Sequence, residues 1–120
     1  MVDEIVSFTV TGAPVPKGRP RVYRGRAVTP ARTVAYEKLV GYSALQARQW
    51  NEPTDKPIRM TMHFYVADNR RRDIDNLQKA VLDGASGILF VDDSQIVSIE
   101  ATKQVDRENP RVEVVLEILT

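Results

Sequence analysis

The chain contains no cysteine and only one histidine, His63, among its 120 residues. Without cysteine it has no disulfide, no thiolate metal site and no cysteine nucleophile. One histidine excludes a zinc site built from several histidines of a single chain. No apolar run reaches about 18 residues, so the sequence predicts no membrane span. The start of the chain, 1–4, is acidic and lacks the pattern of a signal peptide, so we expect a cytoplasmic protein.

Acidic residues are absent from one long stretch near the start of the chain. From Ile5 to Tyr36 there is no Asp or Glu, although the net charge of the chain is only +1. The stretch holds six of the 17 basic residues, namely Lys17, Arg19, Arg21, Arg24, Arg26 and Arg32. A local basic segment on a near-neutral chain is typical of a phosphate-binding surface. A solvated, arginine-rich loop is the alternative interpretation.

The length of the chain predicts one domain, 1–120, with a single core. Alternation of apolar and polar residues predicts four main strands, over residues 6–11, 58–66, 95–104 and 112–118. A short pairing of 21–23 with 26–28 fits the turn residues between them. One helix is predicted after Thr29, which would be its N-cap, and it would end near Asn51.

A second helix is predicted from Asp75 to about Ser86, with Gly84 and Gly87 marking its end. The order of elements is then strand, helix, strand, helix, strand, strand. This order predicts an α+β fold with a single mixed sheet and both helices packed on one face.

Two acidic clusters flank the second helix. Asp73 and Asp75 directly follow the run Arg70–Arg72, and Asp92–Asp93 lies between two apolar runs. In an extended segment a spacing of two places both carboxylates on one side. Asp75 would then lie where a helix N-terminus favours negative charge, and Lys79 would lie one turn further along the same helix face.

Three carboxylates would converge if the loop after the second helix returned to the start of that helix. Oxygen-only ligands favour Mg²⁺ or Mn²⁺ over zinc. Such an ion lowers the pKa of bound water and stabilises charge on a phosphate, and Lys79 could assist the transition state. Together with the arginines, this pattern indicates phosphodiester chemistry on a nucleic acid.

Simpler interpretations of each acid stay open. Asp75 or Asn76 could be a helix cap, Asp73 could pair with an arginine before it, and Asp92–Asp93 could form a polar turn. If all of these interpretations held, the chain would be a non-catalytic DNA-binding module that uses its basic segment. A calcium EF-hand does not fit, because Leu77 falls on a ligand position of that loop. The spacing of a phosphate-binding P-loop is absent.

Two motifs resemble a known family, the RusA-type Holliday junction resolvases of bacteria and their prophages. The first is Arg-Arg-Arg-Asp-Ile-Asp-Asn-Leu-Gln-Lys-Ala at 70–80, and the second is Val-Asp-Asp-Ser-Gln-Ile-Val at 91–97. Chain length and element order also match, so the resemblance covers essentially the whole chain.

The resemblance implies a homodimeric, Mg²⁺-dependent endonuclease, with Mn²⁺ as a possible substitute. It would bind four-way DNA junctions and resolve them by paired, symmetric nicks in recombination and repair. The essential carboxylates of the family fall on Asp73, Asp75 and Asp93, and its lysine falls on Lys79. Asp92 is a neighbour or an alternate ligand. A nuclease for other branched DNA is the remaining alternative.

Basic side chains of the acid-free stretch and of the first motif would then contact DNA phosphates without reading the base sequence. The predicted contacts are Lys17, Arg19, Arg21, Arg24, Arg26, Arg70, Arg71 and Arg72.

Overall fold

The computed structural model describes residues 2–120, so Met1, the first residue of the predicted domain 1–120, lies outside the described residues. The main sheet has four strands in the order β1-β6-β4-β5. These are β1 (Val2–Thr11), β4 (Ile58–Val66), β5 (Ile96–Val105) and β6 (Arg111–Leu119). Strand β6 is antiparallel to β1 and β4, whereas β4 and β5 are parallel. The predicted mixed sheet is confirmed.

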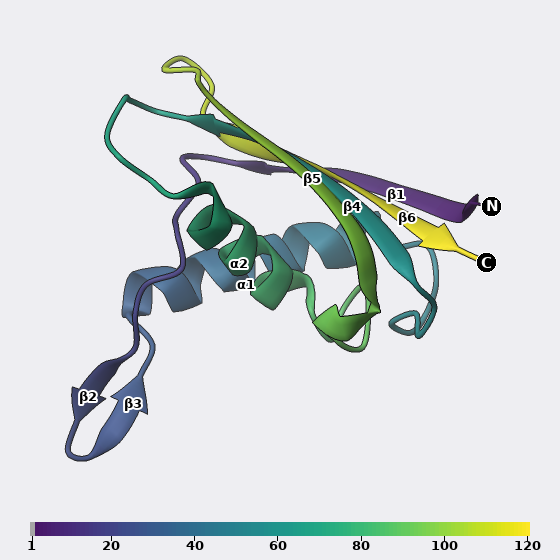
Figure 1. The fold of residues 1–120 in the computed structure, drawn as a ribbon, viewed down its shortest axis with the longest axis horizontal. Coiled ribbons are helices and arrows are strands. Elements are labelled where there is room, and N and C mark those ends of the chain that lie inside the picture. Colours follow the sequence, from purple (N-terminus) through teal and green to yellow (C-terminus); the bar gives the residue numbers. More distant parts are fainter. Residues whose placement is uncertain (1) are drawn as a thin grey trace.

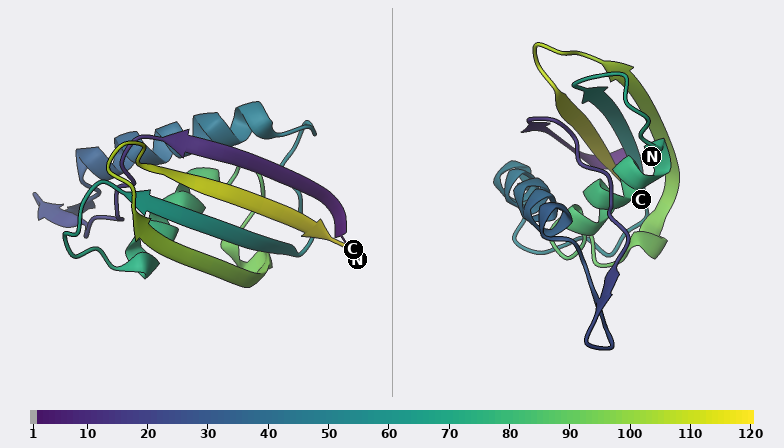
Figure 2. Two further views of the ribbon diagram at one scale, coloured as in Figure 1. Left: turned by 90° about the horizontal axis from the view of Figure 1, so that it is seen from above. Right: turned by 90° about the vertical axis from the view of Figure 1, so that its left-hand side faces the viewer.

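Two helices, α1 (Ala31–Ala47) and α2 (Ile74–Ala85), lie on one face of this sheet (Figures 1 and 2). The alternation along β4 explains this arrangement. Its apolar residues at every second position are buried, while the polar residues between them remain partly or fully exposed. The sheet therefore has one face to cover, and both helices cover it. The predicted α+β class is confirmed.

The two helices approach each other closely where two glycines meet. A Cβ atom added to Gly84 would lie 2.8 Å from the backbone oxygen of Glu37, and one added to Gly41 would lie 3.0 Å from the oxygen of Gly84. Gly84 was predicted to mark the end of the helix. It lies instead within the last turn of α2, where the absence of a side chain lets α1 approach.

A second, two-stranded sheet projects from the body as a hairpin (Figure 1). Strand β2 (Arg21–Tyr23) pairs with β3 (Arg26–Val28), and every residue of both strands is exposed. Arg24 and Gly25 form the turn with φ of 51° and 75°. Positive φ at both central residues suits a two-residue hairpin turn. The short pairing considered from the sequence is confirmed.

Both ends of α1 and the start of α2 differ from the prediction. Pro30, not Thr29, occupies the N-cap of α1. The helix ends at Ala47 because Arg48 is extended, and its Nη1 donates to the backbone oxygen of Ile88 at 3.0 Å. Helix α2 begins one residue earlier than predicted. No helix within residues 2–120 is long and apolar enough to span a bilayer.

Candidate functional site

The N-terminus of α2 presents two exposed carboxylates. Asp73 is the N-cap residue, but its side chain makes no capping hydrogen bond. Its Oδ1 lies 3.7 Å from Arg71 Nε. Asp75 lies in the first turn, where its Oδ1 accepts a hydrogen bond from the Asn76 N–H at 3.0 Å. The simple cap interpretation of Asp75 or Asn76 is therefore wrong, and the Asp73 carboxylate is not used to cap the helix.

Asp93 begins the short 3₁₀ turn η1 (Asp93–Gln95), which Gln95 holds in place. The Gln95 Oε1 accepts from two backbone N–H groups of the same loop at 2.8 Å. Its Nε2 donates to the backbone oxygens of Thr54 and Lys56, each at 2.8 Å. The loop after α2 is thereby fixed to a distant segment, and this fixes where Asp93 meets the helix.

The adjacent acids Asp92 and Asp93 have different environments. The Asp92 Oδ2 accepts from the Ser94 N–H at 3.1 Å, and hydrogen bonding to Ser94 holds the pKa of the Asp92 carboxyl below its usual value. The Asp93 Oδ2 lies 3.9 Å from Lys79 Nζ. Asp92 thus caps the turn, while Asp93 faces α2.

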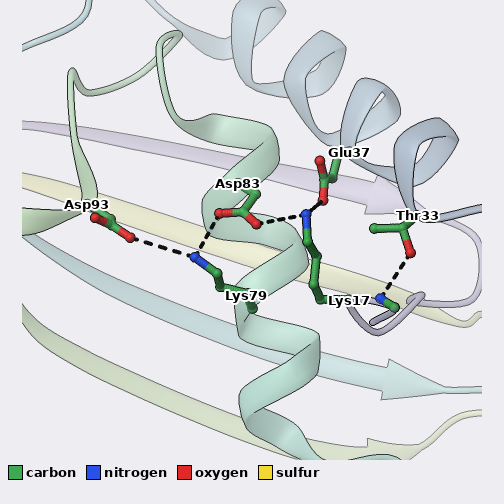
Figure 3. Close-up of polar contacts among 7 residues, drawn as sticks. Lys17, Thr33, Glu37, Lys79, Asp83 and Asp93 are labelled. Carbon is green, nitrogen blue, oxygen red and sulfur yellow. Dashed lines mark hydrogen bonds and ion pairs between the residues drawn. The ribbon is translucent and has the colours of Figure 1, made fainter. Parts of the chain in front are cut away.

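Lys79 belongs to a chain of alternating charges that runs from α1 to the η1 turn (Figure 3). Its Nζ lies 3.1 Å from Asp83 Oδ1 as well as 3.9 Å from Asp93 Oδ2. Asp83 Oδ2 lies 3.0 Å from Lys17 Nζ, and Lys17 Nζ lies 2.6 Å from Glu37 Oε2. These five side chains, from Glu37 to Asp93, are called the charge network below.

Lys17 is held inside this network rather than presented to solvent. Its side chain is only 22% exposed. Its backbone N–H donates to the oxygen of Asn76 at 2.9 Å, and the next N–H, of Gly18, donates to Thr33 Oγ1 at 3.0 Å. Hydrogen bonds to Glu37 and Asp83 raise the pKa of Lys17. The predicted phosphate contact of Lys17 stays a prediction, but its ammonium already has two carboxylate partners.

The close helix approach explains why two carboxylates meet around Lys17. Glu37 lies one turn before Gly41 on α1, and Asp83 adjoins Gly84 on α2. Two such carboxylates repel unless a cation lies between them. Neither acid was predicted from the sequence. The spacing of Asp83 four residues after Lys79 could have indicated it, whereas no local pattern points to Glu37.

The acids predicted to bind a metal are only partly brought together. Within residues 2–120, no group of three His, Asp or Glu side chains is arranged to hold a metal ion. The donor chemistry of carboxylates suits Mg²⁺. The expected convergence at the start of α2 is not seen, because the loop fixed by Gln95 brings Asp93 to Lys79, one turn beyond Asp75.

Within residues 2–120, no ion pair is seen for the arginines of the hairpin. Arg21, Arg24 and Arg26 are exposed, and Arg19 is exposed just before the hairpin. The Arg24 guanidinium lies 5.5 Å from the centroid of the Tyr23 ring, which is itself 64% exposed. The sequence analysis named the arginines but missed this aromatic ring among them.

The three arginines before α2 divide into two kinds. Arg70 and Arg71 are 85% and 94% exposed. Arg72 is only 18% exposed, with its Nη2 2.8 Å from Asp68 Oδ1. Hydrogen bonds from the Arg70 backbone and the Arg72 side chain hold the pKa of Asp68 below its usual value. Arg72 therefore shapes the loop, while its two neighbours point toward solvent.

Comparison with known proteins places the chain in a family. The family described as Endodeoxyribonuclease RusA matches residues 11–117. The crossover junction endodeoxyribonuclease RusA of Escherichia coli K12 is 30% identical over 92% of this chain and 93% of its own length. The enzyme of that name from Enterobacteria phage 82 is 30% identical over 86% and 88%. The Bacillus subtilis protein YqaN is 29% identical over 94% and 96%. The chain belongs to the endodeoxyribonuclease RusA family.

Proposed function

We propose that this protein is a Mg²⁺-dependent endodeoxyribonuclease that resolves four-way DNA junctions in recombination and repair. Family membership supports the nuclease activity, and the names of the Escherichia coli and phage relatives support the junction as substrate. Bacterial and phage relatives also support a bacterial or prophage-encoded protein. Its location in the cytoplasm is a further part of the proposal. The observation that carries the proposal is the position of the Lys79 ammonium, 3.9 Å from Asp93 and one turn beyond the exposed Asp75.

In this proposal the carboxylates of Asp73, Asp75 and Asp93, which do not converge in this structure, would be drawn together around a Mg²⁺ ion, for which Mn²⁺ could substitute. The bound ion would stabilise negative charge on the phosphate under attack. Asp93 is preferred to Asp92 because the Asp92 carboxylate is engaged by the Ser94 N–H, whereas Asp93 faces Lys79. Lys79 would add positive charge beside the phosphate as the bond breaks.

The basic side chains would hold the DNA backbone on both sides of this site. The exposed arginines of the hairpin would contact phosphates. Arg70 and Arg71 would do so as well, since both are exposed and each lies 3.7 Å from its carboxylate partner, Asp68 or Asp73. Paired nicks on opposed strands of a roughly two-fold junction suit a homodimer with two equivalent sites. Light scattering should then give about twice the chain mass of 13.5 kDa, and a strictly monomeric protein would contradict paired cutting.

A nicking assay on a synthetic four-way junction, with and without Mg²⁺, tests the proposal. Linear duplex of the same sequence is the control. We expect Mg²⁺-dependent, symmetric nicks in the junction and none in the duplex. Preferential cleavage of flaps would support a nuclease for other branched DNA. Junction binding without nicking under any metal would leave a DNA-binding module and contradict the enzyme.

A further inference from the structure

The Asp83 carboxylate lies between two lysines and uses a different oxygen for each. Its Oδ1 lies 3.1 Å from Lys79 Nζ, and its Oδ2 lies 3.0 Å from Lys17 Nζ. A carboxylate engaged at both oxygens by separate cations has little freedom to rotate. Its direction toward Lys79 therefore depends on Lys17. Both Lys17 and Asp83 are partly buried, with exposed side-chain fractions of 22% and 26%.

Lys17 is itself fixed from three sides. Its Nζ lies 2.6 Å from Glu37 on α1, and its backbone N–H donates to the Asn76 oxygen at the start of α2. The next residue is bonded to Thr33 on α1. The loop, the two helices and the lysine thus form a rigid support beneath Asp83.

Lys79 is more exposed to solvent than Lys17. Its side chain is half exposed, and its ammonium lies between Asp83 on its own helix and Asp93 on the η1 turn. A long, exposed lysine side chain has many rotamers, so an anchored carboxylate beside it restricts where the ammonium lies. The Asp83 contact is the shorter of the two, at 3.1 Å against 3.9 Å for Asp93.

We propose that Asp83 is a positioning residue that holds the Lys79 ammonium beside Asp93, and that Lys17 orients Asp83 and does not bind DNA phosphate. This inference rests on the proposed nuclease function. It separates Lys17 from the arginines that follow it in the same acid-free stretch. The arginines act on DNA affinity, whereas Lys17 and Asp83 act on the rate of cleavage through Lys79.

The first test compares rate with affinity for Asp83→Asn and Lys17→Met. We expect the single-turnover rate at saturating protein to fall about tenfold in each, because misplacing a reacting group by about 1 Å costs up to about 100-fold. Junction affinity and its salt dependence should stay unchanged for Lys17→Met. Lys56→Met is the matched control, because Lys56 has one exposed partner, Asp3, at the same 2.6 Å. The control should leave both rate and affinity unchanged.

The second test needs no DNA. The NMR order parameter of the Lys79 side chain should fall in Asp83→Asn and, less strongly, in Lys17→Met, with partial recovery in Lys17→Arg. Unchanged Lys79 order in both variants would overturn the positioning role. Weaker junction binding with a normal saturated rate in Lys17→Met would show instead that Lys17 binds phosphate. If the wild-type protein cleaves no branched DNA, the nuclease proposal fails, while the order parameters still decide whether Asp83 positions Lys79.

Discussion

Basic side chains of the same acid-free stretch are exposed in the hairpin, whereas in the charge network one of them, Lys17, is bonded to carboxylates. The hairpin projects from the body, every residue of its two strands is exposed, and its contacts are local (Figure 1). The charge network joins α1, α2 and the η1 turn, and the contacts of Lys17 within it reach residues far away in the sequence, Glu37 and Asp83 (Figure 3). Lys17 and Arg21 are four residues apart, yet only Lys17 is engaged by carboxylates.

This difference shows that charge alone does not define a nucleic-acid surface. An exposed arginine without a partner can exchange counterions for phosphates at little structural cost. A lysine bonded to two carboxylates must first break those contacts. Before α2 two arginines differ in exposure, although both have a carboxylate partner. Arg71 is 94% exposed with its Nε 3.7 Å from Asp73, whereas Arg72 is 18% exposed and lies 2.8 Å from Asp68.

The largest expected effect follows from removing a carboxylate of the proposed site. Asp73→Asn should lower cleavage of a four-way junction by about 100- to 1,000-fold, as loss of one electrostatic stabiliser does elsewhere. Junction binding should be retained or become tighter, since a negative charge near phosphate is removed. Nicking and electrophoretic binding assays on the same preparation measure both. A normal cleavage rate would remove Asp73 from the site.

The hairpin should act on binding instead. The double substitution Arg21→Ala and Arg26→Ala should weaken junction binding for every sequence and flatten the slope of log affinity against log salt by about 2, or about 1 per lost phosphate contact. Arg107→Ala, an exposed arginine in a turn away from the hairpin, is the control. An unchanged slope in the double variant would mean that the hairpin does not meet phosphate.

The two regions should also respond differently to the same substitution of glycine. Gly84→Ala adds a Cβ 2.8 Å from a backbone oxygen of α1. We expect it to lower the free energy of unfolding by about 1–3 kcal/mol, because the packed helices must separate. Urea denaturation measures the loss.

Gly25→Ala is the matched substitution in the hairpin. Its φ of +75° strains any other residue, but nothing lies within 4 Å of the added atom. The strain, about 1–2 kcal/mol, should be confined to the turn and leave global unfolding nearly unchanged. Equal destabilisation by Gly25→Ala would show that the hairpin and the core unfold together.

The smallest effect concerns pH. Hydrogen bonding to Glu37 raises the pKa of Lys17 above 10.5 in the folded protein. A raised pKa means that the contribution of Lys17 to stability is present below pH 10.5 and is lost as pH rises through the folded value. Lys17→Met should therefore cost about 1 kcal/mol at neutral pH, and the difference from wild type should shrink in alkali. A difference that is constant up to high pH would contradict an ion-pair role.

The strands and the class of fold were predictable because their signal is local. Alternation along 58–66 marks which face of the sheet is buried, and the turn residues Arg24 and Gly25 allow a hairpin. The end of α1 was not predictable. Trp50 continues the helical spacing, but Arg48 is extended and its side chain bonds to the oxygen of Ile88, 40 residues away. No local pattern contains that contact.

The candidate site likewise has one part that was predictable from the sequence and another that was not. The motif that contains Asp73, Asp75 and Lys79 is contiguous, so it could be proposed from the sequence alone. The acids that surround Lys17 were missed, because they meet only where α1 and α2 pack through Gly41 and Gly84. The place where Asp93 meets α2 likewise depends on the bonds of Gln95 to a distant loop.

The most direct test of the site compares two neighbouring acids of equal charge. Asp93 faces Lys79 at 3.9 Å, whereas Asp92 caps the turn through the Ser94 N–H. Single-turnover cleavage of a four-way junction should be lost in Asp93→Asn and nearly normal in Asp92→Asn, with equal junction binding by both. Loss of cleavage in Asp92→Asn together with normal cleavage in Asp93→Asn would contradict a site built on the face of α2 that carries Lys79.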